Sequence, residues 1–246
     1  MRNVWIIARR EYKYYFVSPV AYAVVFFFML LLGVFFYLNI SGAILQAAYQ
    51  AYAPDVQIII GPMVTLLLFV MPAVTMRSIS EELRMGTMEL LLTSPVKDWE
   101  LVVGKWLGAF LFVLTMLGIT LIYPLVLNFM VKPGIDQGLL VAGYLGLIMM
   151  VASMVAVGVF VSSIFNNQVV SFFVGLGVIL ILWFVSQFAS NAAGLGNQVL
   201  NYLDFPGHFN NFYQGIINIS DVVYFLSLTS LALLLGTVSI EIRRWR

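Results

Sequence analysis

Two long stretches of this chain contain no charged side chain. No Asp, Glu, Lys or Arg lies between Lys13 and Asp55, or from Gln137 to Leu203. A membrane-spanning helix needs about 20 apolar residues, because the hydrocarbon core is about 30 Å thick and each helical residue rises about 1.5 Å. The composition agrees, with 62% hydrophobic and 9% charged residues and a mean hydropathy of +1.01. We therefore expect an all-α protein that crosses a membrane several times.

The apolar runs divide into six expected spans within a single transmembrane domain, residues 1–246. Ser18-Pro19 separates an N-terminal helix from the first span, since proline lacks a backbone N–H and disfavours helix at the preceding residue. A loop is expected at Ser41–Val56, and the polar string Ser162–Gln168 divides the second charge-free stretch. The expected spans cover about residues 20–40, 57–76, 101–130, 139–161, 169–188 and 222–240.

Residues 2–16 show the period of an amphipathic helix. Its apolar face carries Val4, Ile7, Ala8, Tyr12 and Tyr15. The basic side chains Arg9, Arg10 and Lys13 gather towards the other side. This pattern predicts a helix that lies in the membrane interface with its basic groups near anionic headgroups. The alternative is a positively charged flank before the first span.

One stretch, Arg77–Glu100, concentrates the polar character of the chain. It holds eight of the 23 acidic and basic residues, namely Arg77, Glu81, Glu82, Arg84, Glu89, Lys97, Asp98 and Glu100. A helical projection places Ile79, Leu83 and Leu90 on one face. Arg77, Glu81, Arg84 and Glu89 lie on or near the opposite arc. The pattern predicts a helical elbow that meets a soluble partner; the alternative is a solvated loop with ordinary salt-bridging charges.

The elbow is expected to consist of two short helical pieces. Gly86 interrupts the first piece. Thr87 is available as the N-cap of the second, where Glu89 is favourable at the helix start. Pro95 ends the second piece, and Asp98 can cap the third span.

The distribution of basic residues predicts the orientation of the chain. Six spans place both termini, the 77–100 loop and the 162–168 turn on one side of the membrane. That side carries Arg2, Arg9, Arg10, Lys13, Arg77, Arg84, Lys97, Lys105, Arg243, Arg244 and Arg246. The other side carries only Lys132. By the positive-inside rule, the termini and the 77–100 loop are expected in the cytoplasm.

The string from Glu81 to Phe110 resembles the cytoplasmic loop of ABC-2 type transporter permeases. In that family two acidic residues, a Gly-Thr pair, an acidic residue, a leucine run and a proline lead into a third span that bears Gly-Lys. The corresponding residues here are Glu81-Glu82, Gly86-Thr87, Glu89, Leu90 to Leu92, Pro95 and Gly104-Lys105. Arg10-Glu11 with Ser18-Pro19 resembles the family's amphipathic N-terminal helix. Residues 202–215 and 221–227 are similar to the gliding-motility-associated permease subgroup.

The resemblance implies a permease subunit of an ATP-driven exporter in the bacterial cytoplasmic membrane. It implies a coupling helix between spans two and three that contacts a nucleotide-binding ATPase subunit through Glu81, Glu82, Arg84, Met85, Gly86, Thr87, Glu89, Leu90 and Thr93. The N-terminal helix would add contacts through Arg9, Arg10, Glu11 and Lys13. A second permease chain, expected as a homodimer, would meet this one along spans two and five. The cargo class is a lipid, glycan or other hydrophobic substrate.

The resemblance also implies a re-entrant hairpin on the outer side, at residues 190–218. The candidate site residues of this hairpin are Pro206, His208, Phe209, Phe212 and Gly215. Phe205-Pro206-Gly207 is expected to form its turn, and Phe209, Phe212 and Tyr213 its apolar anchors. The acids Asp55, Asp136, Asp204 and Asp221 are expected to be solvated at the outer interface.

The residues point away from catalysis in this chain. Gly104-Lys105 is followed by Trp106, so it does not match a phosphate-binding loop. The chain has no cysteine and a single histidine, His208, which is a poor basis for a metal site. We expect no bound cofactor, no metal and no nucleic-acid partner, with ATP and magnesium held by the partner subunit. No charge is expected deep in a span, which argues against an ion-coupled transporter.

Two other functional classes remain open at this point. One is a permease-like protein that transmits force to a periplasmic or auxiliary membrane partner, docked on Ser41–Val56 or residues 190–218, without moving a substrate. The other is an integral-membrane enzyme or cofactor protein. The sequence predicts no histidine, cysteine or pair of acids within the membrane, and this disfavours the last class.

Overall fold

The computed structural model describes residues 2–47, 54–88, 96–132, 134–189, 200 and 202–244, and this part of the chain is helical without β-strands. The helices are α1 (Arg2–Val17), α2 (Pro19–Ala47), α3 (Gln57–Thr75), α4 (Ser80–Met85), α6 (Asp98–Thr120), α7 (Ile122–Met130), α8 (Gln137–Ile164), α9 (Gln168–Ala189), α11 (Phe205–Tyr213) and α12 (Ile219–Arg244). Within the described residues, six segments are long and apolar enough to cross a membrane. The prediction of an all-α chain with six candidate spans is confirmed.

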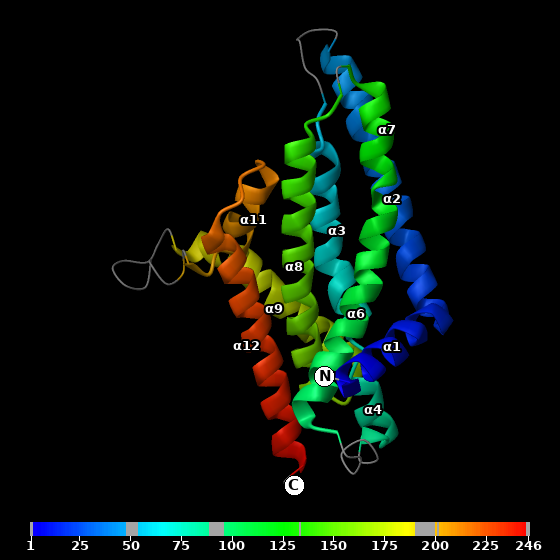
Figure 1. The fold of residues 1–246 in the computed structure, drawn as a ribbon, viewed down its shortest axis with the longest axis vertical. Coiled ribbons are helices and arrows are strands. Elements are labelled where there is room, and N and C mark those ends of the chain that lie inside the picture. The colour runs from blue at the N-terminus through cyan, green and yellow to red at the C-terminus, as the bar shows by residue number, and fades with distance from the viewer. Residues whose placement is uncertain are drawn as a thin grey trace.

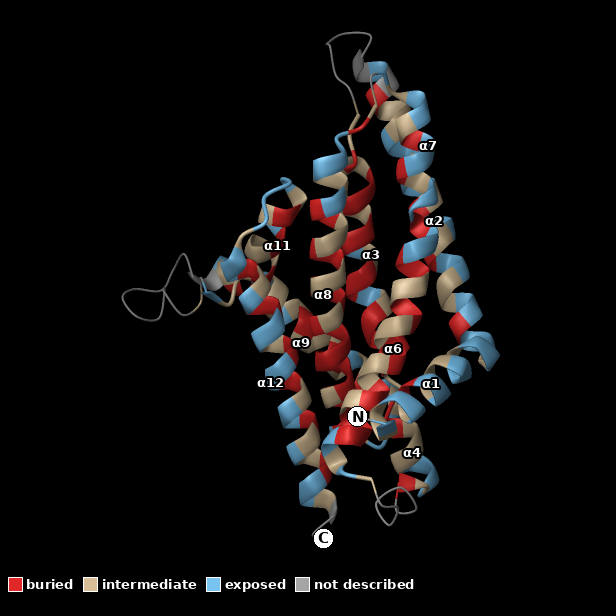
Figure 2. Cartoon of the chain, in the orientation of Figure 1, coloured by how far each residue is buried: buried red, intermediate tan, exposed pale blue. Residues whose placement is uncertain are grey.

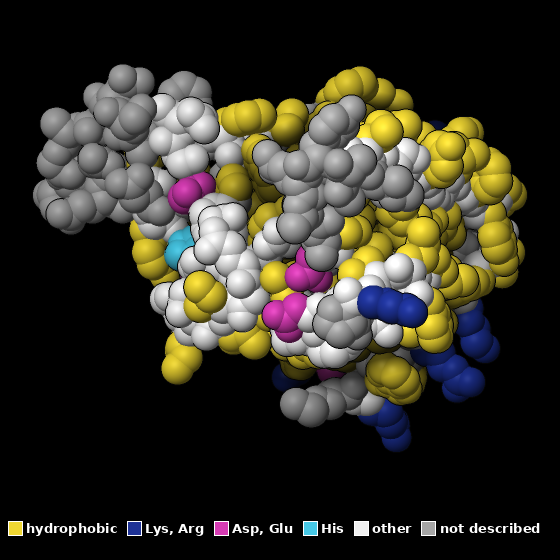
Figure 3. Space-filling model, turned by 90° about the horizontal axis from the view of Figure 1, so that it is seen from above, with side chains coloured by type: hydrophobic (Ala, Val, Ile, Leu, Met, Phe, Trp, Pro, Cys, Tyr) yellow, Lys and Arg dark blue, Asp and Glu magenta, His cyan; other side chains and the backbone are white. Residues whose placement is uncertain are grey.

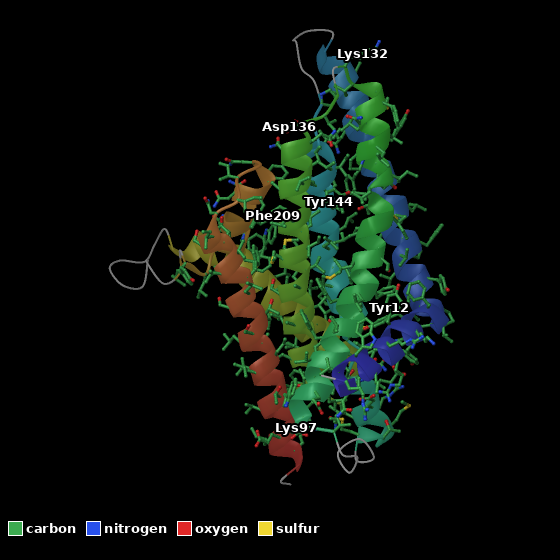
Figure 4. All side chains as sticks on the ribbon, in the orientation of Figure 1. Tyr12, Lys97, Lys132, Asp136, Tyr144 and Phe209 are labelled. Atoms are coloured by element: carbon green, nitrogen blue, oxygen red, sulfur yellow. The ribbon has the colours of Figure 1, made fainter. Side chains whose placement is uncertain are left out.

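Helix α8 lies at the centre of the bundle, with α3, α6, α9 and α12 packed around it (Figure 1). Most of its membrane-length segment is buried, whereas α2 is largely exposed (Figure 2). Both termini and α4 lie at one end of the bundle, which we call the α4 end. Lys132 and Asp136 lie at the opposite end (Figure 4). Seen from that opposite end, apolar side chains gather around the periphery of the bundle, as expected for side walls that face lipid (Figure 3).

Glycines allow close contacts around α8. A Cβ atom at Gly158 would collide with Thr75 of α3, and one at Gly146 would lie 2.5 Å from the Cβ of Phe212 in α11. Gly143 similarly leaves no room for a side chain beside Ile60. Small residues at these positions therefore permit close helix packing. Gly177 differs, because it faces open space.

The ends of three helices differ from the sequence-based expectations. Helix α2 continues to Ala47, so the expected loop at Ser41–Val56 begins later; alanines favour helix at its end. The third candidate span bends at Leu121, where α6 gives way to α7. Pro124 explains the bend, because it has no N–H to donate to the carbonyl of residue 120. Lys97, rather than Asp98, is the N-cap of α6.

The expected turn at Phe205-Pro206-Gly207 is wrong, since these residues form the first turn of helix α11. Proline is well tolerated there because the first helical N–H groups have no intrahelical acceptor. Helix α11 ends at Tyr213 with Gln214 as its C-cap, and Gly215 follows with a left-handed φ of 83°. Gly215 N–H donates to the carbonyl of Phe212 at 3.0 Å, and Ile216 N–H donates to that of Asn211 at 2.8 Å. This pair of hydrogen bonds is a Schellman motif.

Candidate functional site

The short helix α4 is held at its N-terminus by the central helix α8. The backbone N–H groups of Ile79 and Ser80 both donate to the Ser162 hydroxyl oxygen at 3.0 Å. The first N–H groups of any helix need acceptors from outside it, and the N-cap residue Ile79 has no polar side chain. Ser162 therefore supplies the cap from a distant part of the sequence and fixes α4 to α8.

Lys105 of α6 joins three segments at the α4 end. Its ammonium nitrogen lies 2.9 Å from Glu82 Oε1 in α4 and 3.1 Å from Glu11 Oε1 in α1. The same nitrogen donates to the Ser78 carbonyl at 2.6 Å. The Lys105 side chain is 1% exposed, so its charge requires partners within the protein. Three acceptors match the three N–H donors of the ammonium group.

Arg10 adds a second cation at the surface of this group. Its guanidinium lies 3.2 Å from Glu11 Oε1 and 3.6 Å from Glu82 Oε1. Because 55% of its side chain is exposed, solvent weakens these contacts, and Lys105 remains the principal joint. We call Arg10, Glu11, Glu82 and Lys105 the junction cluster. Its two cations and two carboxylates balance in charge.

A polar cavity of about 390 Å³ opens beside the junction cluster. Tyr14 lines it from α1, and Arg77, Glu81 and Met85 line it from α4 and the residues just before α4. Two buried atoms here, Arg77 Nε and Glu82 Oε2, have no hydrogen-bond partner among the described residues. Both residues line the cavity, so an unpaired buried donor and an unpaired buried acceptor belong to its lining residues.

Glycines in α6 bring α1 close enough for these ion pairs to form. A Cβ atom at Gly104 would lie 2.8 Å from Ile7, and one at Gly108 would lie 2.6 Å from the Cβ of Glu11. The backbone of α6 therefore lies directly against α1 at two positions one turn apart. This spacing places Glu11 beside Lys105, which lies between the two glycines.

Two further hydrogen bonds fasten α1 at its ends. Near its start, the Asn3 amide donates to Glu100 Oε2 at 3.0 Å. Near its end, the Tyr15 hydroxyl donates to the Val74 carbonyl at 3.1 Å. Burial raises the pKa of Tyr15, which keeps this hydroxyl protonated as a donor. The apolar face of α1 thus packs on α6, and Ala8 is completely buried.

The predicted contact residues occupy different surroundings. The side chains of Arg84 and Met85 are exposed at the end of α4, and Gly86 ends that helix with a φ of 69°, as expected for an interrupting glycine. The Thr87 hydroxyl donates back to the Glu82 carbonyl at 3.4 Å, so it closes α4. Glu82 faces the junction cluster, whereas Glu81 lines the polar cavity.

The remaining predicted contact residues lie on α1 or fall outside the described part of the chain. Arg9 and Lys13 are exposed on α1, and Glu11 points inward to Lys105. Glu89, Leu90 and Thr93 lie outside the described residues, as does the expected second helical piece up to Pro95. Two important residues were not identified from the sequence: Lys105 as a buried cation, and Ser162 as a cap. The Gly104 to Gly108 spacing around Lys105 was the available signal for a close helix contact.

A second polar cluster joins α11 to α12, in the part of the chain that the sequence predicts on the outer side. We call residues 190–218 the outer segment, and His208, Asn211 and Asp221 the outer cluster. Nδ1 of His208 lies 2.6 Å from Asp221 Oδ1, and Nε2 lies 3.1 Å from the Tyr202 carbonyl. The Asn211 amide donates to Asp221 Oδ2 at 2.8 Å. The imidazole stacks on Tyr224, with ring centroids 4.0 Å apart. Both imidazole nitrogens thus lie within hydrogen-bond distance of an oxygen atom.

The outer acids are not uniformly solvated, contrary to the expectation. Asp221 is 2% exposed, because His208 and Asn211 supply donors to its carboxylate. Asp136 caps α8 by accepting the N–H groups of Gly138 and Leu139. Phe209 and Phe212 are buried against the bundle, as expected for anchors. His208 is the cyan group in Figure 3. Residues 190–199 and 201 of the expected hairpin lie outside the described residues.

The fold and the junction cluster define a multi-pass helical membrane protein in which a short polar helix is fixed to the bundle by ion pairs. The family model described as ABC-2 family transporter protein matches residues 5–242. The chain therefore belongs to the ABC-2 transporter family, as a membrane-embedded permease subunit of an ABC exporter, and membership implies pairing with an ABC ATPase subunit. No curated protein matches the chain.

Proposed function

We propose that this permease couples ATP hydrolysis by its partner subunit to outward movement of a lipid, glycan or other hydrophobic substrate, through α4 and the junction cluster. The observation that carries the proposal is the burial of Lys105 between Glu82 of α4 and Glu11 of α1. A displacement of α4 moves a carboxylate that is paired with a buried cation. Because an unpaired buried charge is costly, α6 and α1 follow α4 instead of separating from it.

The second support is the Ser162 cap, which transmits the same displacement to the centre of the bundle. Two N–H groups of the α4 segment depend on that hydroxyl, so sliding α4 along α8 would leave them without an acceptor. Force applied at α4 therefore reaches α6 through an ion pair and α8 through hydrogen bonds. We propose that the ATPase subunit contacts the exposed residues of α4, including Arg84 and Met85, together with Glu81 and the segment up to Thr93.

The proposal includes the remaining features that the family resemblance implies. Two permease chains form a homodimer with two ATPase subunits in the bacterial cytoplasmic membrane. Both termini and α4 face the cytoplasm, which agrees with the eleven basic residues expected on that side. ATP and magnesium bind the partner subunits. We also propose, from the similarity of residues 202–215 and 221–227, that the chain is related to the gliding-motility-associated subgroup.

A pull-down from native membranes tests the contact. The tagged chain is solubilised in mild detergent and recovered with its partners, which are identified by mass spectrometry and assayed for ATP hydrolysis. Wild type should recover an ATPase subunit in stoichiometric amount, and Arg84→Glu should lose most of it, because the exposed charge on α4 is reversed. Arg2→Glu makes the same change at an exposed position outside the proposed contact and should retain the subunit.

The outcomes separate the alternatives. Loss of the ATPase with Arg84→Glu alone supports contact through α4. Recovery with both variants places the contact elsewhere and refutes the role of Arg84. An additional outward-facing subunit in the wild-type eluate would favour the force-transmitting alternative over substrate transport.

A further inference from the structure

Helix α1 carries basic groups in two different electrostatic situations. Arg10 lies within 4 Å of both Glu11 and Glu82. Arg9 and Lys13 are exposed and form no salt bridge with the residues that the structure describes. One side of α1 is therefore neutralised inside the protein, whereas the other side keeps two uncompensated positive charges.

These two charges line the same hollow between α1 and α6. The hollow has a volume of about 520 Å³ and contains no acidic side chain among its lining residues. Trp5, Arg9, Tyr12 and Lys13 line it from α1, and Leu111 and Leu114 line it from α6. Tyr12 lies where the two helices cross (Figure 4). The hollow is thus basic along α1 and apolar along α6.

The spacing of the two cations favours a single anion between them. Arg9 and Lys13 are four residues apart, so they lie one turn apart on the same face of α1. Like charges at this spacing disfavour each other unless an anion lies between them. An arginine presents a planar fork of donors that fits phosphate, and a neighbouring ammonium adds a point charge.

The apolar side of the hollow identifies what kind of anion fits. Leu111 and Leu114 belong to a candidate membrane span, so the α6 side of this hollow, which we call the groove, is part of a surface that faces hydrocarbon. Trp5, which is 58% exposed, has the amphipathic ring that is enriched at membrane–water interfaces. A small soluble anion would use the charges but leave the leucines bare. A lipid with an anionic headgroup satisfies both sides of the groove.

We propose that this groove is a binding site for one anionic phospholipid. Arg9 and Lys13 hold its headgroup phosphate, and an acyl chain lies along Leu111 and Leu114 beside the ring of Trp5. The site is separate from the junction cluster, although it shares α1 with it. Lipid bound here would brace α1 against α6 from the side opposite to Lys105.

Native mass spectrometry of the full chain in detergent tests the site. The delipidated protein is titrated with phosphatidylglycerol and with phosphatidylcholine of the same acyl chains. Phosphatidylglycerol should bind more tightly, and Arg9→Gln/Lys13→Gln should lower its affinity by about 25-fold, since each basic group near anionic lipid contributes about a factor of five. Arg2→Gln/Lys132→Gln removes the same charge from exposed positions outside the groove and should leave the affinity unchanged.

A second measurement locates the lipid. Phosphatidylglycerol with brominated acyl chains should quench tryptophan fluorescence, and Trp5→Phe should remove most of the quenched component. Equal affinities for the two lipids, or equal losses in both double variants, would overturn the proposal. Full competition by glycerol phosphate would show a simple anion site instead. Protection of Trp5 by a second copy of the chain, without lipid, would show that the groove is a protein interface.

Discussion

At the scale of single residues, the most consequential feature is a lysine without access to water. Glu11, Glu82 and the Ser78 carbonyl surround the Lys105 ammonium group with acceptors. Its burial depends equally on the glycines that flank it, since larger side chains would hold Glu11 at a distance. The charge and the close helix contact therefore support each other.

We predict that Lys105→Ala strongly destabilises the protein. Truncation leaves two mostly buried carboxylates with only the largely exposed Arg10 as a cationic partner, and removing one partner of a buried ion pair costs about 3–5 kcal/mol. The free energy of unfolding is measured by titration with denaturing detergent in mixed micelles. Lys97→Ala, at an exposed lysine near the start of α6, should change it by less than about 0.5 kcal/mol. Similar effects in the two variants would show that Lys105 is not the joint described here.

The outer cluster gives a second prediction at this scale. His208 and Asp221 should be coupled by about 1.5–3 kcal/mol, because their hydrogen bond is short and Asp221 is buried. A double-mutant cycle with His208→Ala and Asp221→Ala measures this coupling and removes effects that each substitution causes alone. The pair Asn211→Ala and Glu241→Ala, whose side chains belong to different surroundings, should be additive. Additivity for His208 and Asp221 as well would contradict the pairing.

At the scale of helices, hydropathy alone could predict the six candidate spans, because crossing hydrocarbon requires long apolar runs. The boundaries were less predictable. The bend at Leu121 follows from Pro124, yet α3 continues through Pro62 and Pro72 without ending. The candidate site was predicted only in part: Glu82 and Glu11 lie in the expected segments, but their common partner depends on how α1 crosses α6. Such a crossing is a tertiary property that no local pattern encodes.

We predict that Gly108→Leu displaces α1 from α6. A Cβ atom there would already lie 2.9 Å from the Ala8 carbonyl oxygen, and backbone cannot move aside as a flexible side chain can. The chain has no native cysteine, so Asn3→Cys with Glu100→Cys provides an oxidative crosslink that reports contact between the helices. Its yield should fall several-fold with Gly108→Leu. Gly118→Leu, on the same helix but facing open space, should preserve it; equal yields in the two backgrounds would refute close packing at Gly108.

At the scale of the whole molecule, α4 is attached to the bundle by interactions of different kinds. Ser162 joins it to the buried central helix, whereas Glu82 joins it through Lys105 to α6 and, by way of Glu11, to α1. Helix α8 in turn packs against α11 and α12, which carry the outer cluster. A continuous set of packed elements thus runs from the α4 end to the outer segment. Such contiguity permits coupling between the two ends of the bundle.

The final prediction therefore separates binding of the ATPase subunit from transmission of movement at α4 to the outer segment. Glu82→Gln keeps the shape of the side chain but removes the charge that α4 presents to Lys105, which retains Glu11 and Ser78 as partners. If the proposed function is correct, this variant should still recover the ATPase subunit. ATP should change the hydrogen exchange of residues 205–213 in the wild-type complex, and this change should be several-fold smaller with Glu82→Gln. Glu241→Gln, an exposed acid on α12, should respond as wild type does. A full response in Glu82→Gln would mean that force reaches the outer segment without the junction cluster, leaving Ser162 and the packing of α8 as the route.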